Sequence, residues 1–177
     1  MNNVARLLLM AAVGTAFMLA PVANAQKTKF EANLAGKNET PAVETSAQGH
    51  ATFEMSPDGK SLKYTLSVND AADVTMAHIH LGEPGQAGKP VAPLYPEKMS
   101  SMSSMSTDKT AGASANKMAM GTGMTCIAQG TITASKLVGS FQGKSIQDLV
   151  EAIRAGKTYV NVHTKAHPDG EIRGTIE

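Results

Sequence analysis

The chain has 177 residues, a length that fits one domain, and a formal net charge of +1. It has no tryptophan and no basic patch, which argues against nucleic-acid binding. Cys126 is the only cysteine, so no internal disulfide can form. There is also no hydrolase nucleophile motif and no phosphate-binding glycine loop, and the sequence identifies no catalytic residue.

The first 25 residues resemble a secretory signal peptide. Arg6 precedes an apolar run that continues to about Ala20, and residues 23–25 form an Ala-Asn-Ala cleavage site. We therefore expect a mature protein that begins at Gln26 and is periplasmic or secreted. No later stretch is apolar enough to cross a bilayer.

Period-2 alternation of apolar and polar residues predicts strands through the first half of the mature chain. These strands are expected at 29–35, 49–55, 62–68 and 74–81. The turn sequence at 56–59 joins the second strand to the third. A short strand at 89–94 contains Pro90 and Pro93, which place it at a sheet edge.

An insert at 97–125 interrupts the pattern. It is rich in Ser, Thr, Ala, Gly and Met and cannot bury enough apolar surface to order itself, so we expect a flexible loop. Its methionines are Met99, Met102, Met105, Met118, Met120 and Met124. Thioether sulfur is a soft ligand that selects Cu(I), which suggests copper or silver capture. The alternative is a low-complexity linker whose composition has no function.

After the insert, two more strands are predicted at 127–132 and 136–141, with Gly139 as a bulge. A short helix then begins at a Ser145 N-cap with Asp148 three residues later, a variant of the capping box. Its apolar residues have helical spacing, and Gly156 ends it. We expect this single helix to cover one end of the fold. A hairpin formed by 159–164 and 171–176 completes the chain.

The strand at 74–81 carries two histidines on one face. His78 and His80 are two residues apart, so their side chains point to the same side, together with Met76. Ala77 and Ile79 point to the other side and form a plausible core face. Two imidazoles at this spacing can bind one metal ion.

The final hairpin supplies further candidate ligands. His163 lies on the face opposite to the core-facing valines, and it comes within reach of His78 and His80 if the hairpin pairs nearby. His167 lies in the turn and ranks below His163. Either Glu171 or Arg173 faces His163, depending on register; a glutamate would orient the imidazole and an arginine would argue against a metal. Copper is the expected ion, because imidazole suits Cu(II).

The segments AHIHLGEPGQAGKPV (77–91) and YVNVHTKAHPDGEIRGTI (159–176) resemble the two signature segments of the CHRD domain, the module first named from chordin. The segment 34–41 resembles the opening of that family, although Ala42 stands where many members have a second proline. The resemblance implies an extracytoplasmic all-β domain over 26–177, interrupted by the insert. It does not imply one settled function. The His-x-His strand is also similar to the copper strand of Cu,Zn superoxide dismutase.

These observations predict an all-β protein, a Greek-key β-sandwich of immunoglobulin-like or superoxide-dismutase-like type with one short helix. The function they favour is exported copper binding, for copper tolerance or delivery. The alternative is a non-catalytic adhesion or interaction module that binds another exported protein without metal. A dismutase-like oxidoreductase needs more firmly fixed ligands than the sequence identifies.

Overall fold

The computed structural model describes residues 26–96 and 124–177, which contain eight β-strands and one α-helix. The strands are β1 Lys29–Ala35, β2 Gln48–Met55, β3 Ser61–Asn69, β4 Val74–Leu81, β5 Lys89–Tyr95, β6 Thr125–Thr133, β7 Thr158–Thr164 and β8 Ile172–Thr175, and the helix is α1 Ile146–Arg154. The predicted all-β fold with a single short α-helix is confirmed. The predicted signal peptide and residues 97–123 of the insert lie outside the described residues.

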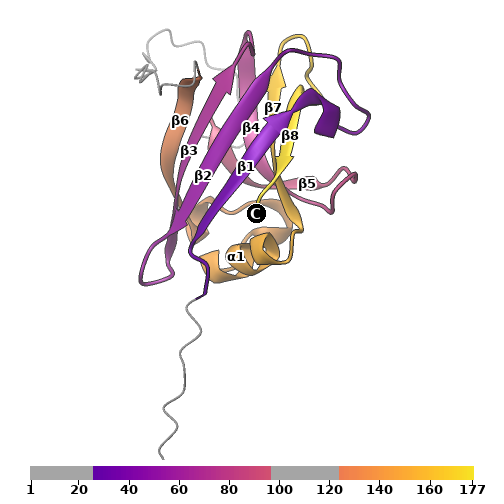
Figure 1. Cartoon of the computed structure of the whole chain (residues 1–177). Coiled ribbons are helices and arrows are strands. Elements are labelled where there is room, and N and C mark those ends of the chain that lie inside the picture. The colour runs from indigo at the N-terminus through magenta and orange to yellow at the C-terminus, as the bar shows by residue number, and fades with distance from the viewer. Residues whose placement is uncertain (1–25, 97–123) are drawn as a thin grey trace, which may run out of the picture.

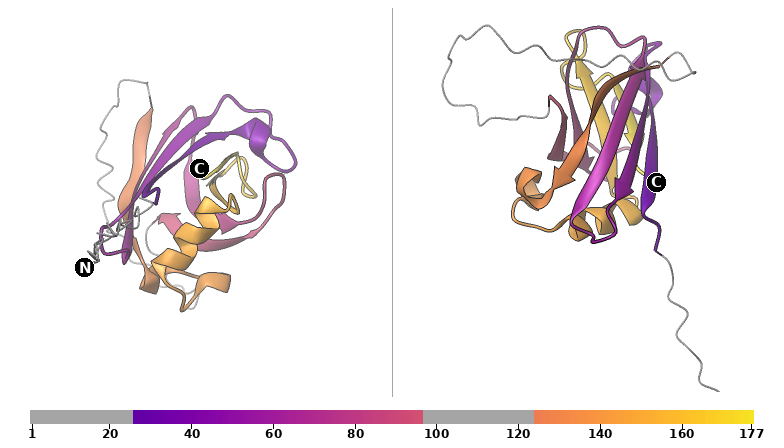
Figure 2. Two further views of the ribbon diagram at one scale, coloured as in Figure 1. Left: turned by 60° about the horizontal axis from the view of Figure 1, so that its bottom comes forward. Right: turned by 90° about the vertical axis from the view of Figure 1, so that its left-hand side faces the viewer.

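The strands form one antiparallel sheet in the order β5-β4-β7-β8-β1-β2-β3-β6. The sheet curls on itself, so that two four-stranded halves face each other across the core (Figures 1 and 2). At the junction of the halves, β8 pairs with β1 at Arg173 and Ala35. On the open side, the N–H of Val138, just after β6, donates to the carbonyl of Val91 on β5 (2.9 Å).

Alternation along each strand builds the core between the halves. In β1, Phe30, Ala32 and Leu34 are buried while their neighbours are exposed, and β2 and β3 repeat the pattern. The most completely buried large side chains are Phe53, Leu62, Leu66, Ile79, Leu94, Ile132, Ile146, Leu149, Ile153, Ile172, Ile176 and Val91. Both halves of the sheet and the helix contribute to this single apolar cluster.

Helix α1 lies across one end of the curled sheet, as predicted (Figures 1 and 2). The Ser145 hydroxyl accepts a hydrogen bond from the backbone N–H of Asp148 (3.2 Å), and the Asp148 carboxylate accepts one from the backbone N–H of Ser145 (2.8 Å). This reciprocal capping box starts the helix. Gly156, with a positive φ of 66°, follows its end.

The predicted strand at 136–141 is wrong. The chain there forms two short 3₁₀ turns, η2 (Ala134–Lys136) and η3 (Gly139–Phe141). Gly139 has a φ of 59°, and a Cβ added there would lie 2.8 Å from the carbonyl oxygen of Pro90. Leu137 and Phe141 are nevertheless buried, so the alternation that suggested a strand reflects two core contacts made from turns.

The capping box generates a test of fold stability. Replacing Ser145 by Ala removes the hydroxyl that accepts from Asp148, so the free energy of unfolding should fall by about 1 kcal/mol. Ser140→Ala is the matched control, because this exposed serine precedes the helix and caps nothing. Urea unfolding of both variants measures the difference. Equal stability of the two variants would contradict the capping role.

Candidate metal centre

Strands β4 and β7 are neighbours in the sheet and bring the two histidine segments together. The core-facing pairs are Ala77–Val162 and Ile79–Val160, and the outward-facing pairs are Met76–His163, His78–Asn161 and His80–Tyr159. The predicted assignment of faces on both strands therefore agrees with the structure. The histidines project from the face of the sheet that is turned away from the core.

The outward-facing histidines form a compact group. The ring centroids are 5.7 Å apart for His78 and His80, 5.6 Å for His78 and His163, and 6.0 Å for His80 and His163. One ligand nitrogen from each ring lies within 4.8 Å of the other two. Bound zinc stands about 2.0–2.1 Å from each imidazole nitrogen, so small side-chain rotations would let the three rings converge on one ion.

Hydrogen bonds fix the orientation of two of the rings. Nδ1 of His80 lies 2.9 Å from the carbonyl oxygen of Gly88, and Nδ1 of His163 lies 2.9 Å from that of Pro168. A carbonyl only accepts, so Nδ1 must carry the proton in both rings, which leaves the lone pair on Nε2. This is the tautomer that a ring needs to bind a metal through Nε2.

Three other nitrogens of the group have no partner. His80 Nε2, His163 Nε2 and His78 Nδ1 are buried and make no hydrogen bond. Buried polar atoms are nearly always hydrogen-bonded, so three unpartnered nitrogens in one place require an explanation. A metal ion bound between the rings would satisfy all of them.

The three imidazoles are neutral at neutral pH. Burial, followed by the charges of His80 and His163, lowers the pKa of His78 to about 4. Burial also lowers the pKa of His80, against the opposing effect of its hydrogen bond to the Gly88 carbonyl. Burial likewise lowers the pKa of His163, against its hydrogen bond to the Pro168 carbonyl and the charge of Asp169. Neutral rings have free lone pairs, which is the state that metal ions bind.

Loops cover this outward face, which is why the histidines are only 5–8% exposed. The β4–β5 loop contributes Gly88, and the β7–β8 loop contributes Pro168. The segment before β2 contributes Thr45, whose hydroxyl donates to the Glu171 carboxylate (2.7 Å). The site is thus enclosed between the sheet and three loops.

A stack of side chains supports His80. The ring of Tyr159 stacks on the ring of His80 at a centroid distance of 5.1 Å. The Arg173 guanidinium also lies over the Tyr159 ring, with its Cζ 3.6 Å from the ring centroid. The Tyr159 hydroxyl accepts from the N–H of Gly88 (2.9 Å), and Arg173 donates to the carbonyl of Gln86. The stack therefore ties the β4–β5 loop to β7 and β8 and holds His80 in place.

The structure settles which residue orients His163. Arg173 lies opposite Asn161, which is two residues before His163 on β7. The Glu171 carboxylate accepts a hydrogen bond from the Thr45 hydroxyl. Neither side chain bonds the ring; the Pro168 carbonyl does. Sequence reasoning considered only side chains and therefore missed Gly88, Pro168 and Tyr159. Strand periodicity could have indicated the contact of Tyr159 with the histidines, because Tyr159 is on the same strand face as Asn161 and His163.

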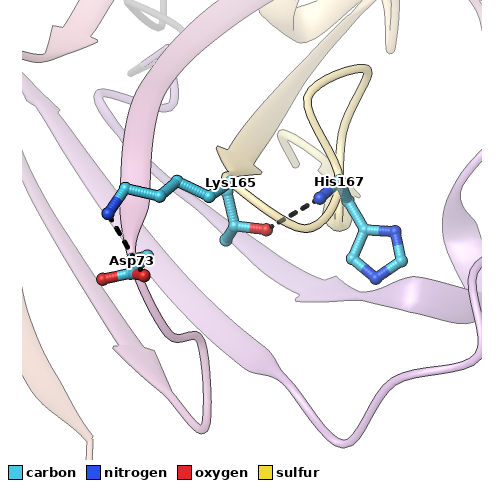
Figure 3. Close-up of polar contacts among 4 residues, drawn as sticks. Asp73, Lys165 and His167 are labelled. Atoms are coloured by element: carbon cyan, nitrogen blue, oxygen red, sulfur yellow. Dashed lines mark hydrogen bonds and ion pairs between the residues drawn. The ribbon is translucent and has the colours of Figure 1, made fainter.

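His167 is not part of the group that the structure brings together. It is half-buried in the β7–β8 loop, where its backbone N–H donates to the Thr164 hydroxyl (3.2 Å). Its imidazole points away from the ion pair between Lys165 and Asp73 (Figure 3). His167 lines a pocket together with Pro41 and Val43.

The predicted methionine ligands are placed only in part. Met99, Met102, Met105, Met118 and Met120 lie outside the described residues. Met124 is half-buried and directly precedes β6, which stands at the far end of the sheet order from the β5-β4-β7 group. The structure therefore leaves the methionine set as a prediction.

Comparison with known proteins identifies the family. No curated protein and no solved structure matches the chain. No helix in the described ranges has the length and apolar character needed to cross a membrane. The model of the CHRD domain matches residues 30–176, which is nearly the whole chain and includes both histidine segments. The chain therefore belongs to the CHRD-domain family.

Proposed function

We propose that this protein is an exported copper-binding protein that serves copper tolerance or delivery. His78, His80 and His163 bind Cu(II), and the methionine-rich insert binds Cu(I). The observation that carries the proposal is a group of three imidazoles, each with a ligand nitrogen within 4.8 Å of those of the other two, and each with a buried nitrogen that has no hydrogen-bond partner. A purely structural cluster would be expected to use these nitrogens in hydrogen bonds.

The ligand chemistry supports copper as the ion. The set consists of neutral imidazoles, with no carboxylate or thiolate of the described residues within the group. Imidazole suits several transition metals, and among the divalent ions Cu(II) binds a given nitrogen site most tightly. Three protein ligands also leave a coordination position open, as transfer of an ion to or from the site requires.

The position of the insert supports a shared role. The strand before the insert, β5, ends beside β4, where Tyr95 pairs with Ala77. The strand after it, β6, begins beside β3, where Thr125 pairs with Val68. Both attachment points therefore lie at the end of the sheet where β3 ends and β4 begins, and Tyr95 is next to the Met76–His163 pair through its partner Ala77. Thioethers bind Cu(I) and compete poorly for hard ions, so the two ligand sets suit the two oxidation states.

The histidine site is tested by Cu(II) titration. His78→Ala should weaken Cu(II) binding at least about tenfold, because loss of even an outer-shell partner of a metal ligand typically costs 10–100-fold. His167→Ala is the matched control, since this histidine lies outside the group and should leave the affinity unchanged. Unchanged affinity in a variant that carries both His78→Ala and His80→Ala would refute the site and leave the metal-free interaction module as the better interpretation.

The insert is tested with the reduced ion. Replacing its six methionines by leucine should weaken Cu(I) binding, measured by competition with a Cu(I)-specific chelator, and leave Cu(II) affinity unchanged. Leucine keeps an apolar side chain of similar volume and removes only the sulfur. Met55→Leu is the control, because Met55 packs against the core. Equal Cu(I) affinity before and after the replacement would show that the methionine composition has no such role.

Export is part of the proposal and rests on the first 25 residues. The protein isolated from cells should begin at Gln26 and be recovered in the periplasmic or secreted fraction. Sequencing its N-terminus provides the measurement. A protein that retained residues 1–25 in the cytoplasmic fraction would contradict it.

A further inference from the structure

We propose that Met76 is a fourth ligand of the histidine site, and that its thioether raises the affinity of the site for Cu(I). This inference rests on the function proposed above and deepens it. Met76 is not part of the methionine-rich insert. It lies on β4, the strand that carries His78 and His80.

The register of the sheet places Met76 beside two of the ligands. It is two residues before His78 on the same strand, so both side chains leave the same face. It also lies directly opposite His163 on β7. Side chains directly opposite each other on paired antiparallel strands have Cβ atoms about 4.5–5.5 Å apart. The Met76 sulfur is two bonds beyond Cβ, so the side chain is long enough for the thioether to reach the space between His78 and His163.

Exposure sets Met76 apart from the other large apolar side chains. It is 41% exposed, and among the described residues it is the only large hydrophobic residue that is exposed. The three histidines beside it are no more than 8% exposed. Met76 therefore lies where the enclosed histidine group meets solvent. Its unbranched side chain has three rotatable bonds and can turn toward an ion that enters there.

The backbone around Met76 is held firmly. The β4–β7 register shifts between Val74 and Met76, and such an irregularity re-aims the side chains beside it. The Thr75 hydroxyl donates to the carbonyl of His163 (3.2 Å), and the N–H of Lys165 donates to the carbonyl of Asp73 (3.1 Å). Both bonds lie before Met76 in the sequence, and the Ala77–Val162 pair follows it, so the backbone of Met76 is fixed relative to His163.

The chemistry of the combined set differs from that of histidines alone. Three imidazoles accept Zn(II) and Cu(II) as well as Cu(I), whereas a thioether contributes mainly to a soft ion. Met76 would therefore determine specificity: it raises affinity for Cu(I) and leaves affinity for Zn(II) nearly the same. The other sulfur residues in the described strands do not offer this ligand. Met55 packs against the core from β2, and Cys126 is on β6, where its thiol contacts the carbonyl of Ala128.

The test uses the full-length mature chain with the six insert methionines replaced by leucine, so that only the histidine site is measured. In this background Met76→Leu should lower Cu(I) affinity by about tenfold or more, equivalent to about 1.4 kcal/mol. Zn(II) and Cu(II) affinities should change little. Met55→Leu is the matched control and should change none of them. Circular dichroism verifies that both variants fold.

X-ray absorption at the copper edge gives a second readout. The Cu(I)-loaded background protein should show a sulfur neighbour that disappears in Met76→Leu and remains in Met55→Leu. Equal Cu(I) affinity in the background and in Met76→Leu, or no sulfur neighbour in the background, would overturn the inference while Cu(II) binding by the histidines stands. If the protein with the six insert methionines replaced by leucine bound no Cu(II) through its histidines, the proposed function and this inference would both be overturned.

Discussion

Strand β7 and residues 77–80 of β4 are buried on both faces, and the candidate site depends on this constraint. One face of the pair contributes Ala77, Ile79 and their partners to the apolar core. The period of a strand then forces His78 and His80 onto the opposite face. A slip of one residue would put imidazoles into the core and isoleucine under the loops, so the apolar packing on one side specifies the position of the ligands on the other.

Burial of the outward face has an energetic cost. A buried polar atom without a hydrogen bond costs about 1–3 kcal/mol, and the site contains three such nitrogens. The loops that create this cost also restrict the rings, because the Gly88 and Pro168 carbonyls fix two tautomers. An ion that binds the three nitrogens removes the cost without any rearrangement of the strands. Binding to the folded state alone then stabilises the fold by linkage.

Strand periodicity was enough to predict much of this arrangement. Alternation located the strands and assigned His78, His80 and His163 to the outward face, because burial on a strand follows sequence directly. It failed at 136–141, where Leu137 and Phe141 reach the core from turns. It also could not identify what orients His163, because the orienting group is a backbone carbonyl in a loop, and every residue carries a carbonyl. Loop contacts depend on the folded position of the loop and leave no pattern of residue types.

The groups that orient the imidazoles are backbone carbonyls and not carboxylates, and this affects the charge around a bound ion. Imidazoles, carbonyls and a thioether are all neutral, so none of them cancels the charge of the metal. The Arg173 guanidinium, stacked on Tyr159 behind His80, adds a positive charge nearby, and it already contributes to the lowered pKa of His80. In a poorly hydrated site, an uncompensated double charge is penalised more than a single one. The Asp169 carboxylate acts in the opposite sense beside His163, where its charge raises the pKa of that ring. Within the proposed ligand set, the Met76 thioether is therefore the group that would distinguish Cu(I) from Cu(II).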